Sequence, residues 1–161
     1  MITREDLLRG LRFNTQRAKA AVEGLTHEDA LLQPPVPGNC MNWVLGHMVS
    51  SRHEALETLG QPALMTEAQA KRYGYGSEPI CEDGEGILCL EEILALLERG
   101  EEALASGLEK VSDEALAEEV KSFMGPVTKG FMVFFMYWHE SYHLGQTEIL
   151  RELALTQGAK G

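Results

Sequence analysis

The sequence predicts an all-α protein, a four-helix bundle with one long crossover between its second and third helices. Four long segments repeat apolar residues every three or four positions, the period of an α-helix, and no segment alternates convincingly as a strand does. The chain of 161 residues is 44% apolar and 24% charged, which is typical of one soluble globular domain over residues 1–161. Four long helices in one domain pack most simply as a bundle.

The first helix is expected to open at Thr3, which can form a capping box with Asp6 three residues later. Its apolar stripe is spaced alternately by three and four residues: Leu8, Leu11, Thr15, Ala18, Val22 and Leu25. A short helical turn is expected after Thr26, and three prolines between positions 34 and 37 stop it.

The second long helix is expected from near Asn39 to the Gly60-Gln61-Pro62 segment, and the third from about 88 to 111. Ser112 is a candidate cap for another short turn. The fourth helix is expected from near Thr128 to about Ala154, and it contains the apolar run 131–138 that makes it the best candidate for the most buried helix. Nearly thirty residues rich in glycine turns join the second helix to the third, and long connections of this kind are often functional.

Charge and cysteine content exclude several classes of protein. Fourteen basic residues stand against twenty-five acidic ones, and a formal net charge of −11 disfavours nucleic-acid binding. Cys40, Cys81 and Cys89 are odd in number and lack CxxC spacing, so we expect reduced thiols. The N-terminus lacks the apolar stretch of a signal peptide, and eight apolar residues fall short of the roughly twenty that a membrane helix needs. A cytoplasmic protein is expected.

His139 and His143 are four residues apart on the expected last helix, so both imidazoles project from the same side. The same face continues through Met136 and Leu150, and it should therefore point inward. A buried imidazole needs hydrogen-bond partners or a metal ion. The pair is thus either part of a metal site or a satisfied pair of core histidines.

His47 is the best candidate for a third ligand, because it lies in a largely apolar part of the second helix. His53, six positions later, points in another direction, and His27 falls near the surface after the first helix. The segment from His139 to His143 also matches the H-E-x-x-H pattern of zinc proteases, in which the glutamate is the general base. Protease activity is disfavoured because no histidine follows downstream and no strand is available to hold a peptide.

Two blocks of the sequence together resemble the DinB-like family. They are Asn42-Trp43-Val44-Leu45-Gly46-His47 and His139-Glu140-Ser141-Tyr142-His143-Leu144-Gly145-Gln146, and the likeness spans nearly the whole chain in helix order. The resemblance implies an up-down-down-up bundle, commonly dimeric, with a metal triad at His47, His139 and His143. The implied metal is divalent, usually zinc or nickel. Some relatives are thiol-dependent transferases or isomerases, and many have no established activity.

Three neutral imidazoles would leave at least one coordination position open, which is typical of catalytic rather than structural zinc. We therefore expect a metal-dependent enzyme acting on a small molecule, either a hydrolase or a low-molecular-weight-thiol transferase. The alternative is a non-catalytic, stress-related bundle with a vestigial metal site. Glu140 is a candidate catalytic base, a candidate hydrogen-bond acceptor for a metal-binding residue, or simply a solvated charge, and Gln146 either orients a ligand or packs.

Overall fold

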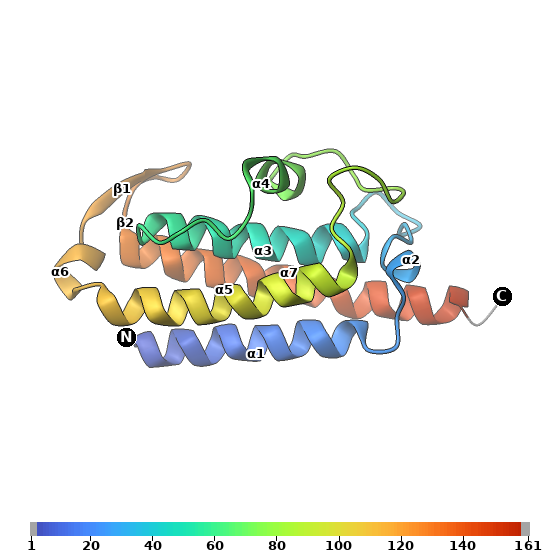
Figure 1. Ribbon diagram of the computed structural model, residues 1–161, viewed down its shortest axis with the longest axis horizontal. Coiled ribbons are helices and arrows are strands. Elements are labelled where there is room, and N and C mark those ends of the chain that lie inside the picture. The colour runs from blue at the N-terminus through green and yellow to red at the C-terminus, as the bar shows by residue number, and fades with distance from the viewer. Residues whose placement is uncertain (1–2, 159–161) are drawn as a thin grey trace.

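Four long helices run side by side along the molecule (Figure 1), and the computed structural model describes residues 3–158. They are α1 (Arg4–Val22), α3 (Met41–Thr58), α5 (Leu90–Lys110) and α7 (Lys129–Gly158). Helices α1 and α7 run in one direction and α3 and α5 in the other. The predicted all-α bundle is therefore confirmed, and its order is up-down-down-up. The parallel pair α3 and α5 is possible because the crossover returns along the length of the bundle.

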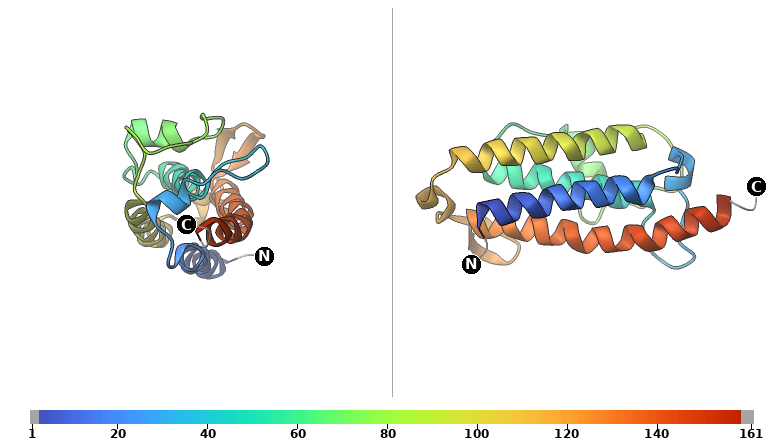
Figure 2. Two further views of the ribbon diagram at one scale, coloured as in Figure 1. Left: turned by 90° about the vertical axis from the view of Figure 1, so that its right-hand side faces the viewer. Right: turned by 90° about the horizontal axis from the view of Figure 1, so that it is seen from below.

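The packing places α3 at the centre of the molecule. It contacts α5 and α7, while α1 contacts the same two helices from the other side, so α1 and α3 are diagonal neighbours (Figure 2). The crossover covers the outer face of α3. Residues 41–53 of α3 are consequently all buried. The expectation that the last helix is the most buried is wrong, because the outer face of α7 meets solvent and leaves Trp138 52% exposed.

The predicted helix caps are present. The Thr3 hydroxyl accepts a hydrogen bond from the Asp6 N–H at 3.1 Å, and the Asp6 carboxylate accepts one from the Thr3 N–H. Thr26 forms the same box at the start of α2 (His27–Ala30), and Ser112 caps α6 (Asp113–Leu116). These local signals could be recognised because a capping box needs only two side chains three residues apart.

Two short elements were not expected. Within the crossover, Thr66 and Gln69 cap helix α4 (Glu67–Tyr73). Residues 119–128 form an antiparallel hairpin of β1 (Glu119–Ser122) and β2 (Gly125–Thr128), so the expectation of no strand is wrong here. Four-residue strands are too short to show a clear alternating pattern. Gly125, at a φ of 97°, takes the left-handed conformation that the tight turn requires.

In the part of the chain that the structure describes, no helix combines the length and the hydropathy needed to cross a bilayer.

Candidate metal centre

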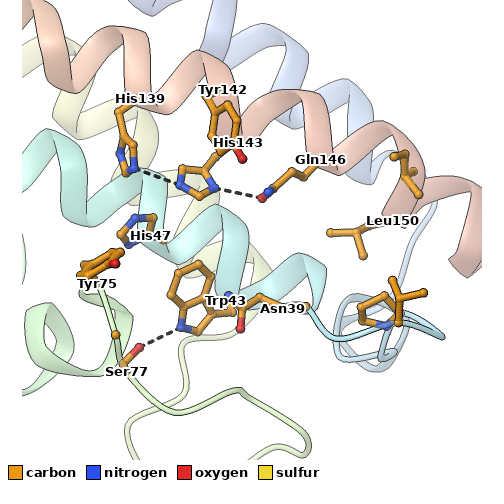
Figure 3. A pocket seen from close by; sticks show the side chains of 15 residues that line it. Asn39, Trp43, His47, Tyr75, Ser77, His139, Tyr142, His143, Gln146 and Leu150 are labelled. Carbon is orange, nitrogen blue, oxygen red and sulfur yellow. Dashed lines mark hydrogen bonds between the residues drawn. The ribbon is translucent and has the colours of Figure 1, made fainter.

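Helices α3 and α7 bring three histidines together (Figure 3). His47 of α3 faces His139 and His143 of α7, and one ring nitrogen from each lies within 4.8 Å of the other two. The Nε2 atoms of His139 and His143 are 3.1 Å apart. His47 and His143 are buried and His139 is half-buried. The fold thus places the imidazole of His47 within coordination reach of the two on the last helix.

A separate oxygen atom engages the Nδ1 atom of each ring. Nδ1 of His47 lies 2.6 Å from the backbone carbonyl oxygen of Tyr73, and Nδ1 of His143 lies 2.9 Å from the amide oxygen of Gln146. Both oxygens only accept hydrogen bonds, so both Nδ1 atoms carry the proton. Nδ1 of His139 lies 3.2 Å from the hydroxyl oxygen of Ser51, whose own proton is donated to the carbonyl of His47. His139 therefore donates from Nδ1 as well.

This arrangement leaves Nε2 of each ring with a free lone pair. The 3.1 Å contact between Nε2 of His139 and Nε2 of His143 cannot be a hydrogen bond, because neither atom carries a proton. Two nitrogen ligands at about 2.1 Å from a shared tetrahedral or octahedral cation lie about 3.0 to 3.4 Å apart. The observed separation falls in that range, so His139 and His143 are spaced as two ligands of one divalent cation, and His47 lies close enough to supply a third.

Burial keeps the three imidazoles neutral. The pKa of His47 is lowered to about 4, chiefly by burial and in smaller part by the neighbouring His143 and His139. Burial also lowers the pKa of His139 and of His143. At neutral pH all three rings are therefore in the uncharged form, which is the form that binds a metal ion.

The crossover fixes the direction of the His47 ring. The aromatic ring of Tyr73 packs directly on Gly46, where a Cβ atom would lie 2.1 Å from the Tyr73 Cδ1 atom. The Tyr73 hydroxyl donates to the side-chain oxygen of Asn42 at 2.9 Å and accepts from the N–H of Leu88 at 2.9 Å. Tyr73 is thereby held against α3, with its carbonyl aimed at Nδ1 of His47. This explains the spacing of Asn42, Gly46 and His47 in one block.

A cavity of about 520 Å³ opens beside the three histidines. Trp43 forms part of its wall and stacks on His47, with ring centroids 4.6 Å apart, and its Nε1 donates to the hydroxyl of Ser77 at 2.9 Å. Tyr75 and Tyr142 contribute further aromatic surface. A small molecule can therefore reach the nitrogen atoms that are left free.

Glu140 does not line this cavity. Its two carboxylate oxygens accept hydrogen bonds from Nε and Nη2 of Arg52, at 2.8 and 2.5 Å, and the pair is fully buried. Arg52 also donates to the Thr15 hydroxyl and to the carbonyl oxygens of Leu97 and Leu11. The catalytic role expected of Glu140 stays a prediction, and this placement favours a structural role. In the sequence, the only indication of the Arg52–Glu140 pair is that Arg52 stands in a mostly apolar helix.

The other predicted polar residues lie where their spacing indicates. Gln146 lines the cavity and contacts His143. His53 faces away from the cluster, and its Nδ1 accepts the backbone N–H groups of Leu64 and Met65 at 3.1 and 3.2 Å. Nε2 of His27 lies 3.4 Å from a carboxylate oxygen of Asp83. Ser51 and Tyr73, which orient two of the rings, were not expected, because these contacts depend on packing between distant segments.

Comparison with known proteins gives one family and a common fold. The family model of the DinB superfamily matches residues 11–147. A conserved protein from Enterococcus faecalis superposes with a TM-score of 0.74 at 16% identity, covering 97% of this chain and 99% of that one. A DinB-like protein from Bacillus cereus ATCC 10987 gives 0.65 at 21% identity, covering 95% and 93%. These two likenesses show the fold alone. No curated protein matches the chain.

Proposed function

Because the chain belongs to the DinB superfamily, we propose that it is a divalent-metal protein whose ligands are His47, His139 and His143, and that it is an enzyme acting on a small molecule. The observation that carries this proposal is the set of three neutral imidazoles, each with its Nδ1 proton engaged and its Nε2 lone pair left free. Imidazole ligands suit zinc, copper, iron and nickel, and of these we propose zinc or nickel, the metals that the resemblance implies. The reaction is hydrolysis or transfer of a low-molecular-weight thiol.

The chain's own residues would bind and orient the reactants. A divalent cation held by three neutral ligands would act as a Lewis acid toward an oxygen or sulfur atom of the substrate. Gln146 holds the ring of His143 through its amide oxygen, and its amide nitrogen can donate a hydrogen bond to a molecule in the cavity. The ring of Trp43 shields His47 from water.

The open cavity supports an enzyme over a vestigial site. Structural zinc is normally closed by four protein ligands. Among the described residues, the cluster offers three ligands, and a cavity lies beside them. A site that had lost its function would not need to keep this access.

We also propose a cytoplasmic homodimer that does not bind nucleic acid. The formal net charge of −11 supports the last point. The three cysteines are free thiols, which suits a reducing compartment. The dimer expected from the resemblance is supported by apolar side chains on the outer face of α7, where Phe131 and Trp138 are exposed.

Elemental analysis of protein purified without an affinity tag tests the metal proposal. We expect stoichiometric zinc or nickel in the wild type, and loss of that metal in His143→Ala because one of three ligands is removed. His27→Gln is the matched control, since this histidine lies outside the cluster and should leave the metal content unchanged. Wild-type protein without metal, or His143→Ala with the same content, would contradict the proposal. Thiol-transfer and esterase assays before and after chelation then separate the two reactions.

A further inference from the structure

The cavity beside the histidines carries no charged side chain. Fifteen residues line it, and none of them is Asp, Glu, Lys or Arg, although these types make up 24% of the chain. Apart from the histidines, which burial keeps neutral, its polar groups are amides, hydroxyls and one indole N–H. The side chains of this cavity therefore carry no charge that could balance one on the body of a bound molecule.

Three separate segments contribute exposed apolar side chains to the mouth of the cavity. Tyr75 of the crossover is 95% exposed, Ile149 of α7 is 74% exposed, and Val36 of the proline-rich loop is 66% exposed. Tyr142 of α7 is exposed as well. Removing such apolar surface from water is favourable. These side chains gather at one cavity from distant parts of the sequence, so the cavity favours an apolar occupant.

Several of the polar groups in the wall are already engaged. Trp43 Nε1 donates to the hydroxyl of Ser77, and the amide oxygen of Gln146 accepts from His143. The amide nitrogen of Gln146 and the side chain of Asn39 remain to contact a ligand. A carboxylate on the body of a bound molecule would meet no cation from the wall, and a thiolate head group would already offset part of the charge of the metal ion. The net charge of −11 adds repulsion at longer range.

We propose that the cavity selects an uncharged, aromatic or branched aliphatic substrate that carries a single metal-binding head group. The head group lies at the histidines, and the body contacts Trp43, Tyr142 and the apolar mouth. Substrates whose body bears a carboxylate are disfavoured. This inference rests on the proposed function, since the head group needs the metal ion. For a thiol substrate it indicates a neutral thiol rather than a peptide-like thiol with free carboxylates.

Two thiols that differ by one carboxylate test the inference on the full-length protein. Cobalt(II) is loaded in place of the native metal, and the thiolate-to-cobalt absorption band is titrated with phenylmethanethiol and with 4-(mercaptomethyl)benzoate. We expect phenylmethanethiol to bind at least about tenfold more tightly, a difference of about 1.4 kcal/mol. Equal affinities, or tighter binding of the carboxylate, would overturn the inference. Failure to load cobalt stoichiometrically would instead overturn the proposed function, and the selectivity with it.

A positive charge placed at the mouth should reduce the preference for the uncharged thiol. Ile149→Lys is suitable because this side chain is largely exposed, so the fold should be unaffected. We expect the affinity for 4-(mercaptomethyl)benzoate to rise severalfold, with cobalt stoichiometry unchanged. Leu155→Lys is the matched control, because it adds the same charge to the same helix at an exposed position that does not line the cavity. Equal shifts in the two variants would show that overall charge governs selectivity, and would contradict a role for the cavity.

Discussion

Two buried polar clusters lie on different sides of α7, although His139 and Glu140 are neighbours in the sequence. Glu140 points into the centre of the bundle, where Arg52 binds both carboxylate oxygens. His139 points toward His47 and the cavity. Each cluster joins α7 to α3. The two clusters differ in whether their hydrogen bonds leave a lone pair free to bind a ligand.

In the Arg52 cluster, α1, α5 and α7 supply acceptors for the guanidinium group, and the carboxylate is fully paired. In the histidine cluster, every Nδ1 proton is used and every Nε2 lone pair is left free. Burial alone therefore does not identify a site. The histidine cluster is distinguished by three free Nε2 lone pairs close together beside an open cavity. In the Arg52 cluster the charged groups are hydrogen-bonded to one another and to the protein.

Removing one partner of the closed cluster should have the largest effect on stability. Glu140→Ala leaves the Arg52 guanidinium buried without its counter-ion, and we expect a loss of about 3 to 5 kcal/mol in the free energy of unfolding. Urea denaturation measures this change. Glu148 lies on the same helix as Glu140 and forms an exposed ion pair with Arg17 of α1. Glu148→Ala removes this pair and should lower the free energy of unfolding by less than about 1 kcal/mol. Similar losses in the two variants would show that the buried Arg52–Glu140 pair is no more important for stability than an exposed ion pair.

Acid should weaken the open cluster in the metal-free protein. The pKa of His47 is about 4 in the folded protein and about 6.5 in the unfolded chain. Below pH 6.5 the unfolded state binds a proton that the folded state does not, so stability falls as the pH drops toward 4. This histidine alone contributes up to about 3 kcal/mol to the loss. Urea titrations of wild type and His47→Gln isolate it, and parallel stability curves would contradict the assignment.

A smaller effect is expected from Gln146, which orients a proposed metal ligand without binding the metal itself. Gln146→Leu removes the acceptor for the Nδ1 proton of His143, and metal affinity should fall by about 10- to 100-fold. The free energy of unfolding should change by less than about 0.5 kcal/mol, since Gln146 lies at the cavity wall. Competition with a chromophoric chelator measures the affinity. Gln157→Leu on the same helix is the control, and an equal affinity in both variants would remove Gln146 from the site.

The sequence predicted those features that depend on nearby residues. Helical periodicity, the capping box at Thr3 and the short turn after Thr26 are local, and so is the one-turn spacing of His139 and His143. The approach of His47 to that pair depends on packing between helices, and the resemblance, rather than periodicity, supplied it. The Arg52–Glu140 pair was missed because its partners are 88 residues apart.

The residues that orient the rings were missed for a related reason. Tyr73 acts on His47 through its backbone carbonyl, so its side-chain type gives no direct signal of that role. Ser51 accepts from His139 across the helix interface. The Ser51 contact follows from the packing of α3 on α7, and the Tyr73 contact follows from the path of the crossover. Turn residues predicted the crossover as a loop, but they did not predict its path. A short capping box within it, Thr66 with Gln69, was the available sign that it contains a helix.

Anomalous diffraction from crystals of the native protein, measured on both sides of the zinc and nickel absorption edges, shows whether a metal ion lies between the three histidines. We expect one anomalous peak among the Nε2 atoms of His47, His139 and His143, at about 2.1 Å from each. If no peak lies at this position and His139 and His143 are in direct contact without a metal ion, the three histidines are not a metal site.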